Sequence, residues 1–484
     1  MVKKVLFLDF NRKNYMPEEC LYTASLVGKE VGFDNLHIIR ISNQEDMAML
    51  EPLLSQCQGH KTAVFCWLYD TFVPSSISAI FLPLMRRLVA QPDMIVTVAG
   101  WQPTLATELF RTSGLFDYVV SGWPWLAAQD WLNSDKPSAT ITLKQQGGGY
   151  PDSVNYMDAF DRIVNVSSCI YNGGSSESCF TYPFEKACTR ACKFCFSNAF
   201  HGEYGGNIRK TPERIIAELN FLRERLGTNR VLITDFRLRL ESVSLLLSHG
   251  FVIAEQVDLC ISDLSPKFLD IMTDAKLDTG FVGIESLVPR VQKDINKYYD
   301  LDKFAENLEY GAEKGLMFEG GIVLGLGATV EKPLTVKDVQ EQIAEAMRFY
   351  RKHPNLRILF YPLIPLIGTP LGNMIWDGDP RPLDLETYLD LVARTIEVRD
   401  IPSHLPLPRC YESKEVYDEI CKATAASAAL VRHKTSLFRY PPKNPLKRKL
   451  CEELGEHMYD MMSAGYYGFS ANIHRMVDTI AKWI

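Results

Sequence analysis

Short apolar runs alternate with amphipathic stretches over the first quarter of the chain. The short runs predict buried strands, and the stretches with apolar residues three or four positions apart predict helices packed on them. The expected strands are 5–10, 36–41, 62–67, 94–99 and 118–120, and the expected helices are 18–31, 44–57, 75–90, 105–112 and 126–132. This βαβα order predicts a doubly wound parallel sheet of flavodoxin or Rossmann type. Ligands bind such sheets beyond the carboxyl ends of the strands, so loops 9–17, 66–74, 100–104 and 121–125 are expected to carry function.

A second series of strand and helix patterns begins near residue 180 and contains six strand signals. Six strands predict a partial (β/α)6 barrel, whose active site lies at the carboxyl ends of its strands. Further on, amphipathic stretches predict helices over 385–399, 413–432, 447–464 and 470–484, which we expect to cover the barrel mouth. The expected regions are an N-terminal domain at 1–135, a Ser-, Gly- and Asn-rich linker at 136–180, the barrel at 181–375 and a helical C-terminal domain at 376–484.

Three cysteines, Cys188, Cys192 and Cys195, lie just after the first expected barrel strand. Thiolates at this spacing are typical metal ligands. A cubane iron–sulfur cluster normally takes four thiolates, so three would leave one iron open to a ligand that is not protein. The alternative is a closed zinc site made by these cysteines with His201.

Composition narrows the function classes. The chain has 484 residues, 46% of them hydrophobic, and a net charge of -7 with no long basic run, which argues against nucleic acid as a partner. No apolar run is long enough for a membrane span, and the N-terminal apolar stretch is too short for a signal peptide. Twelve cysteines in a chain of this length do not make a disulfide scaffold, so we expect a protein of the reducing cytoplasm.

The Cys-x3-Cys-x2-Cys motif resembles the signature of the radical S-adenosylmethionine (SAM) superfamily. Five further segments resemble that family in the expected order, which a closed zinc site would not predict: 207–218, 230–235, 279–286, 315–327 and 359–371. The resemblance implies a [4Fe-4S] cluster on Cys188, Cys192 and Cys195, with SAM on the open iron. One electron, from a donor such as flavodoxin or ferredoxin, would cleave SAM to a 5'-deoxyadenosyl radical. The implied SAM contacts are Phe194, Asp235, Glu285, Ser286 and Gly325.

A second resemblance lies in the N-terminal domain. Residues 99–104 (Ala-Gly-Trp-Gln-Pro-Thr) and 116–122 (Phe-Asp-Tyr-Val-Val-Ser-Gly) are similar to the cobalamin (B12)-binding domain that precedes many radical SAM domains. Trp123 and Trp125 stand where relatives continue with acidic residues, and they would close over a flat ligand, fill a pocket that has lost its cofactor, or serve as core aromatics. The implied cobalamin contacts are Gly100, Trp101, Gln102, Pro103, Thr104, Ser121, Gly122 and Trp123.

The leading interpretation is a radical SAM enzyme that functionalises an unactivated carbon of a small molecule, lipid or peptide by cobalamin-dependent C-methylation. The alternative keeps the radical and replaces methylation by cyclisation, rearrangement, epimerisation or dehydration, with a degenerate B12 domain. A third hypothesis is a non-catalytic iron–sulfur or zinc protein. The sequence assigns no catalytic side chain.

Overall fold

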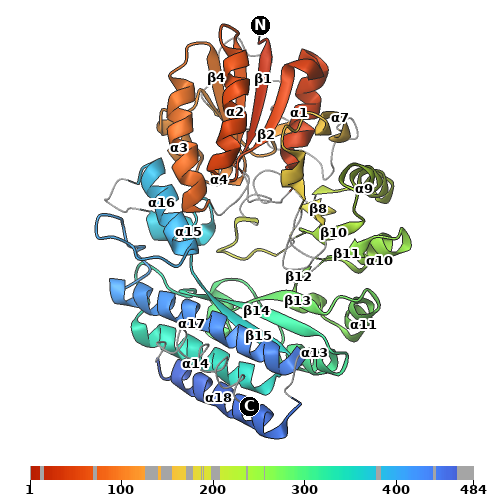
Figure 1. Ribbon diagram of the computed structural model, residues 1–484. Helices are drawn as coiled ribbons and strands as arrows, with labels where there is room; N and C mark the ends of the chain where they lie inside the picture. Colours follow the sequence, from red (N-terminus) through yellow and green to blue (C-terminus); the bar gives the residue numbers. More distant parts are fainter. Residues whose placement is uncertain are drawn as a thin grey trace.

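Two α/β units follow one another along the chain, and a helical layer lies at the far end of the second unit (Figure 1). The computed structural model describes residues 2–10, 16–68, 73–125, 140–142, 155–170, 178–186, 188, 190–197, 208–235, 238–254, 257–377, 383–439 and 443–465.

The first unit is a parallel sheet of six strands in the order β2-β1-β3-β4-β5-β6. The strands are β1 (Lys4–Asp9), β2 (Leu36–Arg40), β3 (Thr62–Trp67), β4 (Met94–Ala99), β5 (Tyr118–Ser121) and β6 (Thr140–Thr142). The helices are α1 (Glu18–Val31), η1 (Phe33–Asn35), α2 (Gln44–Cys57), α3 (Ser75–Val89), α4 (Trp101–Leu105) and α5 (Thr107–Thr112). Residues of β3 are buried throughout, as expected for a strand with helices on both faces. The predicted doubly wound fold is confirmed.

Two details of this unit differ from the prediction. The helix expected over 105–112 is two short helices, α4 and α5, which meet at Ala106, and α4 begins directly after Gly100. Pro103 has no backbone N–H and sits in the first turn of α4, where none is needed. The helix expected over 126–132 lies outside the described residues.

Residues 155–170 lie in the region expected to be a linker, and they pack against the first sheet. This segment holds α7 (Met157–Phe160) and η2 (Val166–Cys169). The N–H of Ile38 in β2 donates to the carbonyl of Arg162 at 2.9 Å, and the N–H of Val164 donates to the carbonyl of Ile38 at 2.8 Å. The segment therefore covers the free edge of β2, which would otherwise expose unpaired backbone groups.

The second unit has six parallel strand positions, which confirms the predicted partial barrel. Its two sheets have the orders β11-β10-β7 and β12-β13-β14-β15. The strands are β7 (Phe180–Tyr182), β10 (Arg230–Ile233), β11 (Val252–Ile253), β12 (Val257–Leu259), β13 (Thr279–Glu285), β14 (Met317–Leu324) and β15 (Leu356–Pro362), with β11 and β12 sharing the third position. An antiparallel pair, β8 (Glu185–Lys186) and β9 (Ile208–Arg209), follows β7.

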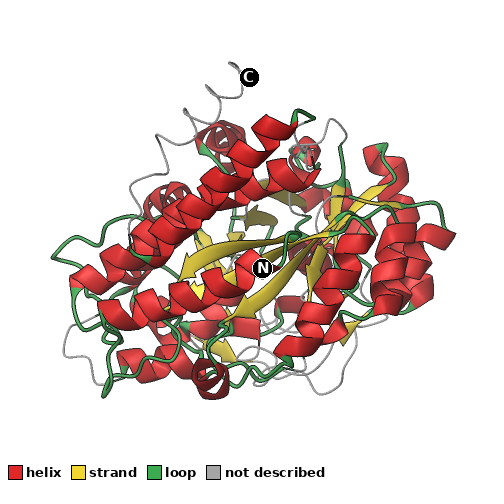
Figure 2. Cartoon of the chain, turned by 90° about the horizontal axis from the view of Figure 1, so that it is seen from below, coloured by secondary structure: helices red, strands yellow, loops and turns green. Residues whose placement is uncertain are grey.

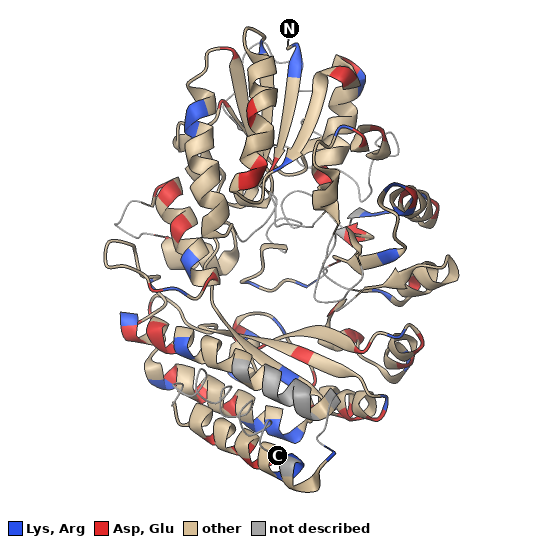
Figure 3. Ribbon diagram, in the orientation of Figure 1, with Lys and Arg blue, Asp and Glu red and all other residues tan. Residues whose placement is uncertain are grey.

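Helices surround the barrel strands on the outside (Figure 2). They are α9 (Pro212–Leu226), α10 (Leu240–Ser248), η3 (Ile261–Asp263), α11 (Pro266–Asp274), α12 (Pro289–Asp294), α13 (Leu301–Glu313) and α14 (Val336–Lys352). Helix α15 (Pro370–Trp376) follows β15 and contacts the loop of the three cysteines, because Leu371 N–H donates to the carbonyl of Lys193. Among the described helices, none combines the length and apolar character that crossing a bilayer requires. Lysine, arginine and acidic residues are interspersed over these helices (Figure 3).

Of the described C-terminal helices, α17 (Lys414–Arg439) and α18 (Pro445–Ser463) do not cover the barrel mouth as predicted, while α16 (Leu385–Ile396) packs on α3 of the first unit. The helix expected over 470–484 lies outside the described residues. Helix α17 runs along β15, where the N–H of Phe360 donates to Ser427 Oγ at 3.1 Å. Helices α14, α17 and α18 form one layer, so α17 closes the edge of the last strand.

A buried charge network joins the two units. Lys210, which follows β9, is buried and its ammonium contacts Glu18 of α1 and Glu218 of α9, the latter at 3.0 Å. Hydroxyls of Tyr22 and Tyr182 donate to Glu218 at 2.9 and 2.7 Å. Burial opposes the ionisation of Glu218, but the charges of Lys210 and Arg214 hold its pKa below the usual value. The interface therefore depends on groups that are costly to bury singly.

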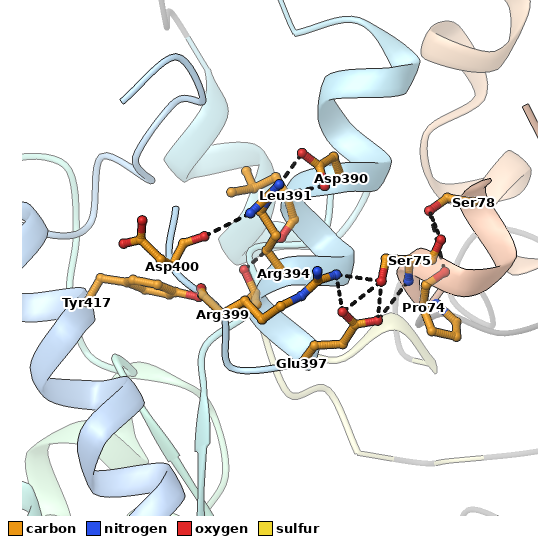
Figure 4. A network of polar contacts seen from close by, with 11 residues as sticks. Pro74, Ser75, Ser78, Asp390, Leu391, Arg394, Glu397, Arg399, Asp400 and Tyr417 are labelled. Atoms are coloured by element: carbon orange, nitrogen blue, oxygen red, sulfur yellow. Dashed lines mark hydrogen bonds and ion pairs between the residues drawn. The ribbon is translucent and has the colours of Figure 1, made fainter. Parts of the chain in front are cut away.

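A second tie joins α3 to the segment after α16 (Figure 4). Pro74 precedes α3 and provides no side-chain cap. Glu397 takes that role from a distant part of the chain, because its carboxylate accepts from the N–H of Ser75 at 2.8 Å and from Ser75 Oγ. Arg399 pairs with the same carboxylate. A negative group at a helix N-terminus is favourable, so this contact holds α3 against the C-terminal domain.

Replacing Lys210 by Met tests the first tie. The substitution keeps much of the volume but leaves Glu18 and Glu218 buried without their shared cation, so we expect the free energy of unfolding to fall by about 3–5 kcal/mol. Denaturant unfolding measures it. Lys337→Met on the exposed face of α14 is the control, with an expected change under about 0.5 kcal/mol. Equal stability of the two variants would contradict the role given to Lys210.

Candidate active site

The three cysteines lie in a loop fixed at the carboxyl ends of the barrel strands. Lys193 N–H donates to the carbonyl of Ile295 at 3.1 Å, and its own carbonyl accepts from Leu371 N–H at 3.0 Å. Asn296 Nδ2 donates to the carbonyl of Ala191 at 3.0 Å. The loop after β7 is thus attached to the segments that follow β13 and β15.

The thiols have the exposure that an open cluster needs. Cys188 and Cys195 are partly exposed and Cys192 is buried. Within the described part of the chain, no three His, Cys, Asp or Glu side chains converge as ligands of a single ion, and His201 lies outside that part. Three thiols of one fixed loop, two of them accessible, fit a [4Fe-4S] cluster with one iron left for another ligand.

Glu285 ends strand β13 in a strained conformation. Its φ is 65°, and the pairing of β13 with β14 shifts between Gly283 and Glu285. Lys297 Nζ donates to Glu285 Oε1 at 2.9 Å and to the carbonyl of Gly283 at 2.8 Å. A Cβ on Gly283 would lie 2.5 Å from Glu285 Oε1, so a larger residue here would displace the Glu285 carboxylate. Left-handed backbone and bulges cluster at functional sites because surrounding contacts must maintain them.

Ser286, the neighbouring predicted SAM contact, is buried. Its Oγ accepts from Val288 N–H at 3.2 Å, and its carbonyl accepts from Tyr299 OH at 2.7 Å and from Gln292 Nε2 at 3.0 Å. These bonds hold the turn after β13. Glu285 is the residue of this pair that is accessible at the barrel mouth.

Asp235 has one oxygen occupied and one without a partner. Its Oδ1 accepts from the N–H groups of Phe184 at 2.6 Å and Glu185 at 3.2 Å, in the chain that leads to Cys188. Its Oδ2 is buried and has no hydrogen-bond partner among the described residues. Burial raises the pKa of Asp235 to about 8. The residue therefore positions the entry to the cysteine loop, and its contact with SAM stays a prediction.

The two remaining predicted SAM contacts lie at the same end of the barrel. Phe194 is partly buried against the core. Gly325 follows β14 with a φ of 107°, and a Cβ there would lie 2.9 Å from Leu363 Cβ and 3.1 Å from Tyr411 OH. Gly325 thus lets the chain turn closely past these side chains. Its contact with SAM stays a prediction.

The carboxyl ends of β4 and β5 are tied together and touch the cysteine loop. Thr104 Oγ1 donates to the carbonyl of Gly100 at 2.6 Å and accepts from Gly122 N–H at 3.0 Å. The ring of Trp101 meets that of Phe196, the residue after Cys195, edge to face with centroids 5.0 Å apart. The predicted cobalamin contacts and the predicted cluster ligands are therefore neighbours.

Indole rings occupy the strand ends of the first sheet. Trp123 stacks on Trp125 with centroids 4.9 Å apart, Trp101 meets Trp123 edge to face at 6.1 Å, and all three are buried. Gln102 and Ser121 are fully buried, and Thr104 and Pro103 lie inside as well. A cavity of about 10 Å³ remains, lined by Glu19, Trp67, Gly100, Trp101, Gly122, Trp123 and Pro124. This is less than the roughly 300–1,000 Å³ of a typical ligand pocket.

Sequence reasoning missed Glu19 as a lining residue, whereas Trp67 lies in loop 66–74, which was expected to carry function. Trp67 is the last residue of β3, so its position at a strand end was the available signal. Glu19 lies in the first turn of α1 and had no such signal.

Comparison with known families settles the class of the second unit. Residues 182–339 match the model described as the Radical SAM superfamily. This part of the chain is therefore a radical SAM domain. The match marks the protein as a radical SAM enzyme and supports a [4Fe-4S] cluster and SAM as its cofactors. An uncharacterized protein of Methanocaldococcus jannaschii is 25% identical over 158 residues, which are 31% of this chain and 45% of that protein. The matched region spans less than half of that relative.

Two solved radical SAM enzymes share the fold along nearly the whole chain. The methyltransferase TsrM of Kitasatospora setae, in a structure with cobalamin and a [4Fe-4S] cluster, has a TM-score of 0.56 at 13% identity and covers 95% of this chain and 100% of its own. The cobalamin-dependent radical enzyme OxsB, with aqua-cobalamin bound, has a TM-score of 0.53 at 11% identity, covering 96% of this chain and 72% of its own. At these identities the likeness establishes the architecture.

The pKa of Asp235 predicts how stability depends on pH. A buried carboxyl whose folded pKa is raised to about 8 stabilises the fold in its protonated form, and that contribution is lost as pH rises from the unfolded value near 4 through 8. The asparagine side chain in the Asp235→Asn variant carries no charge at any of these pH values. We expect the protein without cofactors to lose more thermal stability between pH 6 and pH 9 than Asp235→Asn does, as measured by melting temperature. Parallel pH profiles would rule out this titration.

Proposed function

We propose that this radical SAM enzyme holds cobalamin between its first sheet and its barrel and methylates an unactivated carbon of a small molecule, lipid or peptide. The observation that carries the proposal is the contact of Trp101 with Phe196. It places the ends of β4 and β5 against the cysteine loop, so a group held there would adjoin the cluster. The fold shared with two cobalamin-bound enzymes supports this arrangement.

The chain's own residues have distinct tasks in this proposal. Cys188, Cys192 and Cys195 ligate the cluster through their thiolates. Asp235 Oδ2 accepts from the ammonium of SAM, and Glu285, held by Lys297, takes a further polar contact at the barrel mouth. When bound, the cluster and SAM supply a carbon-centred radical and cobalamin supplies a methyl group, while the protein sets their positions. The electron donor is proposed to be a flavodoxin or ferredoxin.

Gly100 and Gly122 would let backbone approach the corrin or its nucleotide tail. Their φ values are 123° and 94°, and both line the cavity beside Trp101 and Trp123. Backbone N–H groups at such turns face a ligand without a side chain between.

A second candidate function keeps the radical and omits methylation. It is favoured by the indoles of Trp101, Trp123 and Trp125, which fill space at the strand ends where a ligand of this fold binds. In this case the radical would drive cyclisation, rearrangement, epimerisation or dehydration.

Cofactor retention separates the two candidates. The protein is purified without oxygen, reconstituted with iron, sulfide and hydroxocobalamin, and desalted. We expect about one corrin and one [4Fe-4S] cluster per chain by absorbance and metal analysis, with 5'-deoxyadenosine formed from SAM after reduction. A protein that keeps the cluster and cleaves SAM but retains no corrin would refute methylation and support the second candidate.

Gly122→Ala adds a residue-level test. A Cβ at this left-handed position strains the backbone beside the cavity, so corrin retention is expected to fall about tenfold while the cluster stays. The control is Gly114→Ala, which has a φ of 70° but open space around its added Cβ. Equal corrin retention in the two variants would contradict the placement of cobalamin at β5.

A further inference from the structure

Four residues form one row across the inner face of the barrel. The strand register pairs Asp258 with Phe281, Phe281 with Glu319, and Glu319 with Arg357. Residues that are paired directly across neighbouring strands form a row, and their side chains point to the same face of the sheet. This row crosses β12, β13, β14 and β15.

The neighbouring positions show which face the row occupies. The side chain of Leu259 packs over Gly280, on the side where Met272 of α11 also lies. The side chain of Phe318 packs over Gly311 of α13. These residues point outward to the helices. Because successive side chains of a strand alternate between faces, Asp258 and Glu319 point to the inside of the barrel.

The next row toward the mouth is nearly free of side chains. It holds Gly283, Gly321 and Leu359. A Cβ on Gly321 would lie 2.7 Å from Phe281 Cζ and 3.4 Å from Tyr361 Cε2, so two aromatic rings lean over this glycine. Tyr361 is 38% exposed on the same face. The two rings thus pack over Gly321 on the accessible inner face of the barrel between Asp258 and Glu285, and this face is called the recess below.

One carboxylate of this recess has no cationic partner. Glu285 pairs with Lys297 at 2.9 Å, and Glu319 pairs with Arg357 at 3.6 Å. Among the described residues, no ion pair or hydrogen bond involves the side chain of Asp258, although its carboxylate is accessible. Surrounding protein and, secondarily, the charge of Glu319 raise the pKa of Asp258 to about 6. It is ionised at neutral pH at a free-energy cost that a cationic ligand would offset.

We propose that Asp258 binds a protonated amine of the substrate, whose apolar or aromatic body packs against the accessible faces of Phe281 and Tyr361. This inference rests on the proposed radical function, because it names the class of substrate for that reaction. Phe281 lies four positions before Glu285 along β13, so the amine would lie about 13 Å from the mouth. Cation–π attraction to the two rings adds to the charge contact.

Binding of two small probes of opposite charge tests the proposal. 2-Phenylethylamine and 3-phenylpropionate share an aromatic ring and differ in the sign of their charge. Their dissociation constants are measured at pH 7.5 by saturation-transfer NMR on the full-length protein, with no SAM or corrin needed. We expect the amine to bind about tenfold more tightly than the acid, and Asp258→Asn to abolish that preference.

Asp274→Asn, on the exposed outer helix α11, is the matched control and should keep the preference. Affinity for the amine should also fall below about pH 6, where Asp258 gains a proton beside Glu319, Arg357, Tyr361 and Glu285. The proposal is overturned if the probes bind equally, if neither binds, or if Asp258→Asn keeps the preference. Amine selectivity in a protein that neither retains corrin nor cleaves SAM would uphold this site and refute the proposed function.

Discussion

The buried ammonium of Lys210 is the interaction on which the rest of the structure depends. It lies between carboxylates from α1 of the first unit and α9 of the second, inside a shell of tyrosines. Charges buried in this way are favourable only when every partner is present, so the network fixes how the units meet. Because the relative position of the two units is fixed, the carboxyl ends of β4 and β5 face the loop of Cys188, Cys192 and Cys195.

From this geometry the candidate chemistry follows. Parallel sheets place their functional loops at the carboxyl ends of the strands. Here the carboxyl ends of the first sheet and those of the barrel strands face each other. The contact of Trp101 with Phe196 marks where they meet. On the barrel side, a strained Glu285 and a half-satisfied Asp235 supply polar contacts, and deeper rows supply aromatic rings and Asp258.

Much of this could be predicted from local sequence. Continuous apolar runs such as 62–67 identify strands buried on both faces, and the three-cysteine motif identifies the cluster loop without help from the fold. What failed was non-local. The break at Ala106, the packing of residues 155–170 on β2, and the position of α17 along β15 all depend on tertiary contacts that periodicity does not encode.

The site shows the same division. The resemblance to radical SAM enzymes implied Asp235 as a SAM contact, but only the structure shows that its carboxylate accepts from the N–H groups of Phe184 and Glu185. Asp258 could be assigned to a strand but not to a recess, because strand register decides which residues share its row. Glu19 had no signal at all, since it comes from a helix turn facing another strand's loop.

The open iron is the central claim, and electron paramagnetic resonance of the reduced, reconstituted protein tests it most directly. If only Cys188, Cys192 and Cys195 hold the cluster, adding SAM should change the g values of the reduced [4Fe-4S] signal, because SAM becomes a ligand to iron. A signal that is unchanged by SAM, in a protein with a full cluster, would contradict it.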